Sequence, residues 1–292
     1  MKNIARAVTR LKYFCAIGIA FSTGCLALEF HGVWTQGGLL VGNIAPGAIV
    51  RFDNKVVPVT PSGHFVIGLG RDTSPQVALT VERDGALTTH TFQVVQRQYD
   101  VQRVEGVPQE TVTPPKSVLD RINREAALVS RARAHSASRE DFMQGFVRPM
   151  EGPVTGVYGS QRVYNGTPKN PHFGLDIAGP TGTLVRAPAP GKVKLVHRDM
   201  YFSGGTLIVD HGYGVFSTFI HLSDILVKEG DQVQPGDGIA RVGATGRATG
   251  PHLDWRINWY DVRVDPALVL EYFPARAAAH STPHAATKAT AH

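Results

Sequence analysis

The sequence predicts a mainly β protein with a small N-terminal β-sandwich-like domain, a linker helix and a C-terminal antiparallel β domain. Before residue 105, runs of β-branched and aromatic residues alternate closely with turn residues. Pro114 and Pro115 then interrupt this pattern, and apolar residues follow at helical spacing. After residue 146 the apolar runs are short, with Gly or Pro every few residues. The 292 residues are 42% hydrophobic, which is enough to bury a core.

Residues 1–27 have the pattern of an export signal. Basic residues end at Lys12, an apolar stretch runs to about Phe21, and a small-residue cleavage site ends at Ala27. The apolar stretch is shorter than the ~20 residues of a membrane helix, so we expect no membrane span after signal removal. Lipid anchoring at Cys25 is the less favoured alternative. Both cysteines lie in this segment, so the mature chain is expected to form no disulfide.

The basic charge is partly a property of this signal. The formal net charge is +6, but four of the 30 Lys and Arg residues lie in residues 1–27, where there is no acidic residue. The remainder carries 26 basic and 24 acidic residues. Nucleic-acid binding needs a clustered basic surface, so we expect no nucleic-acid partner.

Residues 28–110 are predicted to form an accessory β domain. Strand-like runs occupy residues 39–41, 48–52, 64–67, 77–81 and 89–95, separated by turn signals such as Asp84-Gly85. The histidines at 31, 64 and 90 are scattered, which indicates surface or packing roles and no catalytic constellation.

Residues 111–145 are predicted to be a helical linker, with Ser117 as its N-cap and a stripe that includes Val118 and Val129. The helix is either a spacer packed against one domain or an arm that docks an envelope protein partner, and we favour the spacer. Residues 275–292 are mostly Ala, Thr and His, so we expect a disordered tail.

The region 146–274 carries the candidate functional residues. His252 and Asp254 are two positions apart, which places both side chains on one face of a strand, about 6.6 Å apart. Trp255 would then face the core. A Gly-rich loop over residues 243–251 precedes them, and it allows backbone to approach a ligand closely.

His172 and Asp176 are four residues apart, which spans about 13 Å on a straight strand. A bend at Gly174 would bring both side chains to one ion. The segment 217–223 is predicted to be a strand that ends in His221. A histidine at such a position is able to hold a substrate group or move protons. Each of these short motifs alone is a weak indication of a metal site. Their order along the chain, with the Gly-rich loop before His252, makes the indication stronger.

At these residues, the stretch from about 152 to 266 resembles the lysostaphin-type, or LytM-like, family of peptidoglycan zinc peptidases. The matching segments are Pro171–Ala178, Ala187–Val193, Val209–Gly214, Phe219–Ser223 and Val242–Asp254. The resemblance implies an antiparallel sheet with a groove across its face and cleavage of peptide cross-links in the cell wall. By position, His172 and Asp176 match zinc ligands, and His221 and His252 match catalytic histidines. The resemblance also implies a structural role for His211.

The chain departs from the family at position 254, where Asp stands in place of the second histidine of an HxH pair. Aspartate binds zinc at about 2.0–2.2 Å, so Asp254 is predicted to be the third ligand of one Zn²⁺. Two carboxylates give the loaded site a formal charge of zero rather than +1. Such a site should acidify bound water less and tilt toward harder ions such as Mn²⁺.

The sequence therefore predicts an exported, most simply periplasmic, zinc-dependent endopeptidase that acts on the peptide stems of peptidoglycan. One alternative is a metal-poor, non-catalytic scaffold that binds cell wall or activates an amidase. A second is a structural envelope protein that binds glycan through residues 28–110 and docks through the linker helix. The sequence leaves open which cross-link is cut.

Overall fold

The structure is a computed structural model, and it describes residues 28–104, 116–164 and 166–275. The predicted export signal and nearly all of the predicted tail lie outside these residues. Among the described helices, none has the length and apolar character needed to cross a bilayer.

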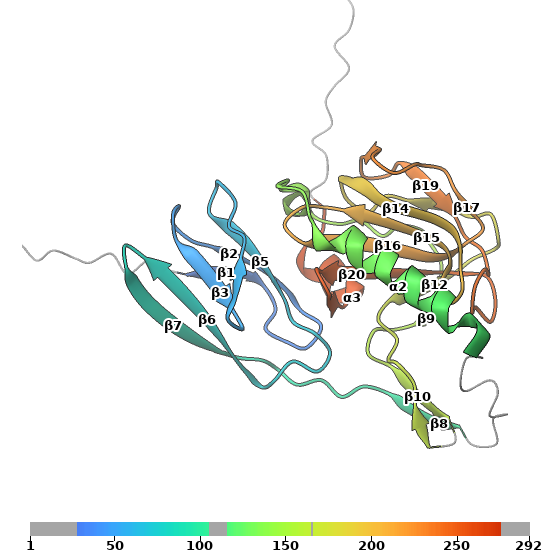
Figure 1. Cartoon of the computed structure of the whole chain (residues 1–292), viewed down its shortest axis with the longest axis horizontal. Coiled ribbons are helices and arrows are strands. Elements are labelled where there is room, and N and C mark those ends of the chain that lie inside the picture. Colours follow the sequence, from blue (N-terminus) through green and yellow to red (C-terminus); the bar gives the residue numbers. More distant parts are fainter. Residues whose placement is uncertain (1–27, 105–115, 165, 276–292) are drawn as a thin grey trace, which may run out of the picture.

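The N-terminal part contains two antiparallel sheets, as the sandwich-like prediction required (Figure 1). The first has the order β1-β2-β5 and the second β4-β3-β6-β7. All five predicted strands are present, and β1 and β4 are additional. The strands are β1 (Glu29–Gly32), β2 (Leu39–Asn43), β3 (Ile49–Phe52), β4 (Lys55–Val57), β5 (His64–Gly68), β6 (Gln76–Arg83) and β7 (Ala86–Gln93).

The C-terminal part is built on an eight-stranded sheet with the order β18-β14-β15-β16-β20-β12-β9, and β21 pairs with β20. Its strands are β9 (Val154–Gly156), β12 (Leu175–Ala178), β14 (Gly191–Met200), β15 (Gly204–Asp210), β16 (Val215–Leu222), β18 (Gln232–Val233), β20 (His252–Trp259) and β21 (Val262–Val264). A small sheet adds β13 (Leu184–Arg186), β17 (Asp224–Ile225) and β19 (Gly238–Arg241). All described pairs in these two sheets are antiparallel, which confirms the predicted fold class.

A further three-stranded sheet joins the two parts of the chain. β8 (Val101–Val104) pairs in parallel with β10 (Gln161–Tyr164), and β10 pairs with β11 (Thr167–Pro168). The end of the predicted accessory region is therefore hydrogen-bonded to the region that carries the candidate site. Arg97 Nη1 also lies 2.8 Å from Asp265 Oδ2, in an ion pair between the two parts.

The linker contains a 3₁₀ turn η1 (Lys116–Val118), the helix α2 (Leu119–Ala134) and a second turn η2 (Asp141–Gln144). The prediction of Ser117 as N-cap was wrong. Val118 occupies that position and makes no side-chain cap, because the 3₁₀ turn already leads into the helix. The short helix α3 (Pro266–Tyr272) was not predicted. It begins with a cap in which Ala267 N donates to the Asp265 side chain.

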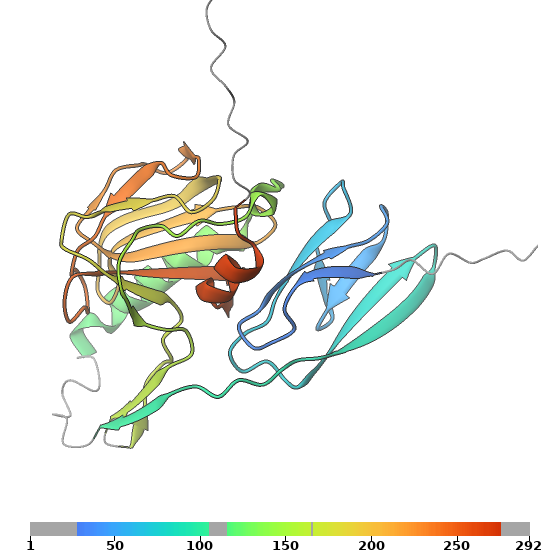
Figure 2. The ribbon, with the colours of Figure 1, turned by 180° about the vertical axis from the view of Figure 1, so that it is seen from behind.

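Helix α2 runs across one face of the eight-stranded sheet, as both ribbon views show (Figures 1 and 2). Its Val129 and Ala132 pack against a small apolar cluster on that face, formed by Leu195, Met200, Ile208 and Phe216. The helix is therefore a spacer packed against the C-terminal part, which was the favoured of the two interpretations.

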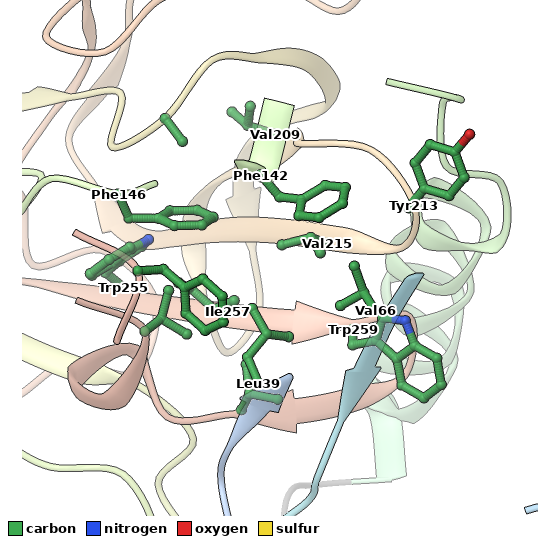
Figure 3. Packing of buried hydrophobic residues seen from close by; sticks show 14 of the residues in the cluster. Leu39, Val66, Phe142, Phe146, Val209, Tyr213, Val215, Trp255, Ile257 and Trp259 are labelled. Atoms are coloured by element: carbon green, nitrogen blue, oxygen red, sulfur yellow. The ribbon is translucent and has the colours of Figure 1, made fainter. Parts of the chain in front are cut away.

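The opposite face of the sheet carries the main core, which continues into the N-terminal part. Trp255 and Ile257 of β20 are fully buried there. Figure 3 shows Val66 of the N-terminal sheet beside Trp259, and Leu39 belongs to the same buried cluster. A Cβ at Gly68 would lie only 2.7 Å from Trp259 Cβ, so the two parts are in close contact.

The turn η2 is fixed to this core by Phe142, which is 1% exposed and meets the Tyr213 ring edge-on. We expect Phe142→Ala to lower the free energy of unfolding by about 3–5 kcal/mol, because it removes a buried ring and leaves a cavity. The neighbouring Met143 is 40% exposed. Met143→Ala should therefore change stability by less than about 0.5 kcal/mol. Urea unfolding of both variants checks this, and equal losses would contradict it.

Candidate metal centre

The candidate site is built where β12 and β20 pair. Asp176 and Asp254 are direct cross-strand partners, so their side chains emerge on the same face of the sheet. β20 begins at His252, as the alternation predicted, and Trp255 points to the opposite, buried face. The pairing register therefore brings two carboxylates together, although they are far apart in the sequence.

His172 lies in the segment that leads into β12. Its N–H donates to Ser160 O and its carbonyl accepts from Gly159 N, both at 2.8 Å. This backbone pairing positions the imidazole over the two carboxylates. His172 Nε2 is 3.2 Å from Asp176 Oδ1, and His172 Nδ1 is 3.9 Å from Asp254 Oδ2.

One donor atom from each of His172, Asp176 and Asp254 lies within 4.8 Å of the other two. His172 Nε2 and Asp176 Oδ1 are buried and make no hydrogen bond, despite their short separation. Burial opposes protonation of His172, but the carboxylates of Asp176 and Asp254 outweigh it and raise its pKa. Buried polar atoms without partners that converge on one point, in a negative environment, fit a divalent cation.

Arg256 is the functional residue that sequence reasoning missed. Its Nη2 donates to Asp254 Oδ2 at 2.6 Å, and its Nε donates to Oδ1 at 2.9 Å. Burial opposes ionisation of Asp254, but the charge and hydrogen bonds of Arg256 lower its pKa below the ordinary value. The alternation that links 252 to 254 continues to 256, so the sequence did contain this signal. The formal charge of the three predicted ligands with Zn²⁺ remains zero, but Arg256 adds one positive charge beside them.

The two predicted catalytic histidines lie side by side, with ring centroids 4.9 Å apart. His221 Nδ1 is 2.8 Å from Thr245 O, and His252 Nδ1 is 2.8 Å from Gly250 O. A carbonyl oxygen only accepts, so in both rings Nδ1 carries the proton and Nε2 is left for chemistry. Both carbonyls belong to the Gly-rich loop, whose role here is to orient the two imidazoles.

His221 is held in an uncommon conformation at the end of β16. Its φ is +65°, in the left-handed region that non-glycine residues rarely adopt. Its N–H donates to Ser203 O at 2.8 Å, which fixes that backbone. Burial lowers the pKa of His221 below 6.5, so the ring is neutral at pH 7 and its Nε2 can accept a proton.

Three further histidines, His31, His64 and His211, lie away from the site. His211 is fully buried, with Nδ1 2.6 Å from Pro190 O and Nε2 2.8 Å from Ser217 Oγ. His31 Nε2 is 2.5 Å from Tyr272 O, and His64 Nδ1 is 2.9 Å from Ser62 Oγ. These contacts are structural and do not extend the site.

Two glycines make room for the carboxylates. A Cβ at Gly174 would overlap Asp254 Oδ1, and a Cβ at Gly156 would overlap Asp176 Oδ2. A side chain at either position would therefore displace a donor atom. The glycine at 174, expected to supply a bend, has the additional role of leaving space for Asp254.

We expect Gly174→Ala to weaken divalent-metal binding by about 10- to 100-fold, the loss typical of disturbed support around a ligand. Gly250→Ala is the matched control, because a Cβ there meets nothing within 4 Å. Competition titration against a chromogenic chelator measures both affinities. An unchanged affinity in the Gly174 variant would show that Asp254 does not need this space.

Comparisons with known proteins place these residues in one family. The model of peptidase family M23 matches residues 170–266, a segment that contains all five candidate site residues. Peptidoglycan DD-endopeptidase ShyB of Vibrio cholerae is 42% identical over 87 residues, which are 30% of this chain and 20% of that protein. DD-carboxypeptidase/endopeptidase Mpg of Neisseria meningitidis is 37% identical over 117 residues, which are 40% and 27% of the two chains. The chain thus spans about a quarter of the length of these curated relatives.

A solved structure extends the similarity beyond that segment. A Pseudomonas aeruginosa protein assigned to peptidase M23 is 34% identical with a TM-score of 0.63, over 82% of this chain and 96% of that one. The likeness therefore includes most of the N-terminal part. With nearly the whole of that protein matched and the family model covering every candidate site residue, the chain belongs to peptidase family M23.

Proposed function

We propose that this protein is an exported zinc-dependent endopeptidase that hydrolyses peptide cross-links of bacterial peptidoglycan. The observation that carries the proposal is the convergence of three metal donors beside two imidazoles whose Nδ1 atoms are held by backbone carbonyls. The named activity of the relatives supports the substrate class, although they match over only part of their length. A periplasmic location is part of the same proposal, because that substrate lies outside the cytoplasm.

The metal would be held by His172, Asp176 and Asp254, which satisfy the ligand types that zinc accepts. A zinc ion bound there supplies Lewis acidity, which polarises a carbonyl and lowers the pKa of bound water. Arg256 adds one positive charge to the two carboxylates. With Zn²⁺ the formal charge of the group is then +1, equal to that of a site with two neutral histidines and one aspartate.

The protein side chains manage protons and orientation. His221 is neutral at pH 7 because burial lowers its pKa, so its Nε2 is able to accept a proton and later return it. His252 Nε2 lies 3.9 Å from Asp176 Oδ1, beside the donor set. From there His252 is placed to stabilise negative charge that develops on the attacked carbonyl.

The Asp254–Arg256 pair also favours a second candidate function, a non-catalytic scaffold. Arg256 satisfies both oxygens of Asp254 without an ion, so this carboxylate is stable in a metal-free protein. A scaffold of this kind would bind cell wall or activate a separate amidase. Docking of an envelope protein through the linker helix is a weaker proposal, because Val129 and Ala132 already pack within the chain. Glycan binding through the N-terminal sheets is compatible with both functions.

The peptidase proposal predicts that purified sacculi release cleaved cross-links when treated with the zinc-loaded protein. A chelator should abolish the release and zinc should restore it. His221→Ala should lower kcat by about 10²- to 10⁴-fold while leaving zinc content unchanged, because it removes a proton carrier and no ligand. Analysis of released muropeptides by mass spectrometry measures this. No cleavage with any divalent metal would favour the scaffold.

Metal analysis distinguishes the two functions directly. Asp254→Ala should lower the bound zinc strongly, because it removes a ligand and leaves Arg256 without its counter-charge. Asp254→His should retain zinc, because an imidazole is an equivalent donor. Asp224→Ala, which removes an exposed partner of Arg198, is the control and should bind zinc as the wild type does. Equal zinc content in wild type and Asp254→Ala would remove Asp254 from the ligand set.

A further inference from the structure

Three arginines meet on the sheet face that helix α2 covers. Arg256 lies on β20, Arg263 lies on β21 opposite Asn258, and Arg133 projects from α2. Arg133 Nη2 donates to Thr218 Oγ1 at 2.8 Å, and Thr218 is the cross-strand partner of Arg256. The strand register and the helix together bring three positive charges into one region.

Only one of these charges is compensated by the described part of the chain. Arg256 is paired with Asp254. Arg133 and Arg263 have no carboxylate within 4.0 Å among the described residues, and they donate hydrogen bonds to the Thr218 hydroxyl and the Asn258 amide oxygen. Arg133 is 5% exposed, and its Nε has no hydrogen-bond partner. Burying a cation without an anion is costly, so this arrangement is suited to receive one.

The nearby acidic groups do not fill this need. Glu125 accepts from Arg121 Nε at 2.7 Å and from Tyr201 N at 2.8 Å, so both its oxygens are engaged. Asp261 is exposed on the β20–β21 turn and forms no ion pair within the described residues. Burial and the charges of Arg263 and Arg256 lower the pKa of Arg133, and the more distant Asp261 carboxylate offsets this only in part.

A cavity of about 350 Å³ lies at this point between α2 and the sheet, with Arg133 and Arg263 in its lining. Ser130 and Ser203 add hydroxyl groups, and Phe202 adds an apolar wall. The carboxylates of Glu125 and Asp261 also line the cavity, Glu125 with both oxygens already engaged. Ser203 also accepts the N–H of His221, so the cavity adjoins the candidate catalytic histidine. Its volume is at the lower end of small-ligand sites and suits one or two amino acids rather than a glycan strand.

We propose that this cavity is a substrate subsite in which Arg133 and Arg263 bind a free carboxylate of the stem peptide. The inference rests on the proposed function and deepens it. A residue next to the cross-link that keeps a free carboxylate would present that group to the two arginines. Guanidinium groups bind such groups through charge-assisted hydrogen bonds, and a carboxamide, which lacks the charge, binds less well. The subsite would therefore select substrates by the charge of a residue next to the cleaved bond.

The test uses two synthetic cross-linked peptides that differ only in a free carboxylate or a carboxamide beside the link. The full-length, zinc-loaded wild type should cleave the carboxylate peptide with about 10- to 100-fold higher kcat/KM, mainly through KM. Arg263→Gln and Arg133→Gln should each remove most of this preference, because they lower kcat/KM for the carboxylate peptide more than for the carboxamide peptide. Arg131→Gln, which changes an exposed arginine on the same helix, is the matched control and should keep the preference.

Thermal unfolding and zinc content of each variant separate recognition from folding, and Arg133→Lys retains the charge if the glutamine variant fails to fold. Equal cleavage of both peptides by the wild type would overturn the subsite. An equal loss on both peptides in the arginine variants would also overturn it, because a structural role predicts that result.

A binding experiment separates this inference from the peptidase proposal. Calorimetry with metal-free protein and short uncross-linked peptides measures the carboxylate preference without cleavage. A preference that depends on Arg133 and Arg263, without cleavage of either cross-linked peptide, would support the subsite and count against the peptidase. Cleavage without preference would do the reverse. Inorganic phosphate is the third probe, and tight phosphate binding without peptide discrimination would identify a free-anion site and overturn the substrate role.

Discussion

The central constraint is the placement of Asp176 and Asp254 as direct partners across β12 and β20. Like charges opposite each other destabilise a sheet, so this register requires nearby positive charge. His172 approaches both carboxylates, and Arg256 binds Asp254 through both of its oxygens. A divalent cation would complete this balance. Gly156 and Gly174 leave room for the two carboxylates, and the backbone hydrogen bonds of His172 hold its imidazole beside them.

The pair formed by Asp254 and Arg256 connects the metal centre with the rest of the sheet face. Asp254 points to the metal donors, while Arg256 lies toward Thr218 and the arginines beneath α2. An imidazole at position 254 would not require a cationic neighbour, whereas a carboxylate does. Asp254 and Arg256 therefore act as a unit with a net charge of zero, which equals the charge of a neutral histidine ligand.

Helix α2 determines how much of the sheet face a substrate can reach. Its apolar residues pack over Leu195, Ile208 and Phe216, which covers the part of the face away from the site. Nearer to His221 the helix contributes Arg133, and a cavity remains between helix and sheet. The linker thus forms one wall of this cavity as well as a connection. The N-terminal part is joined to the C-terminal part through the parallel β8–β10 pairing and the Arg97–Asp265 ion pair.

The sequence alone determined the fold class and the strand that carries His252 and Asp254, and it indicated the candidate metal donors and histidines, because alternation and motif order are local properties. It did not determine which strands are neighbours. The tertiary structure decided that Asp176 pairs opposite Asp254. It also placed carbonyls of the Gly-rich loop at Nδ1 of both His221 and His252. Finally, it brought Arg133 of the linker and Arg263 to the lining of one cavity. For Arg256, the alternation along the strand predicted the face of the sheet on which it lies, but only the structure identified Asp254 as its partner. These contacts join residues tens of positions apart, and sheet register and helix packing, which depend on the whole chain, set the distances between them.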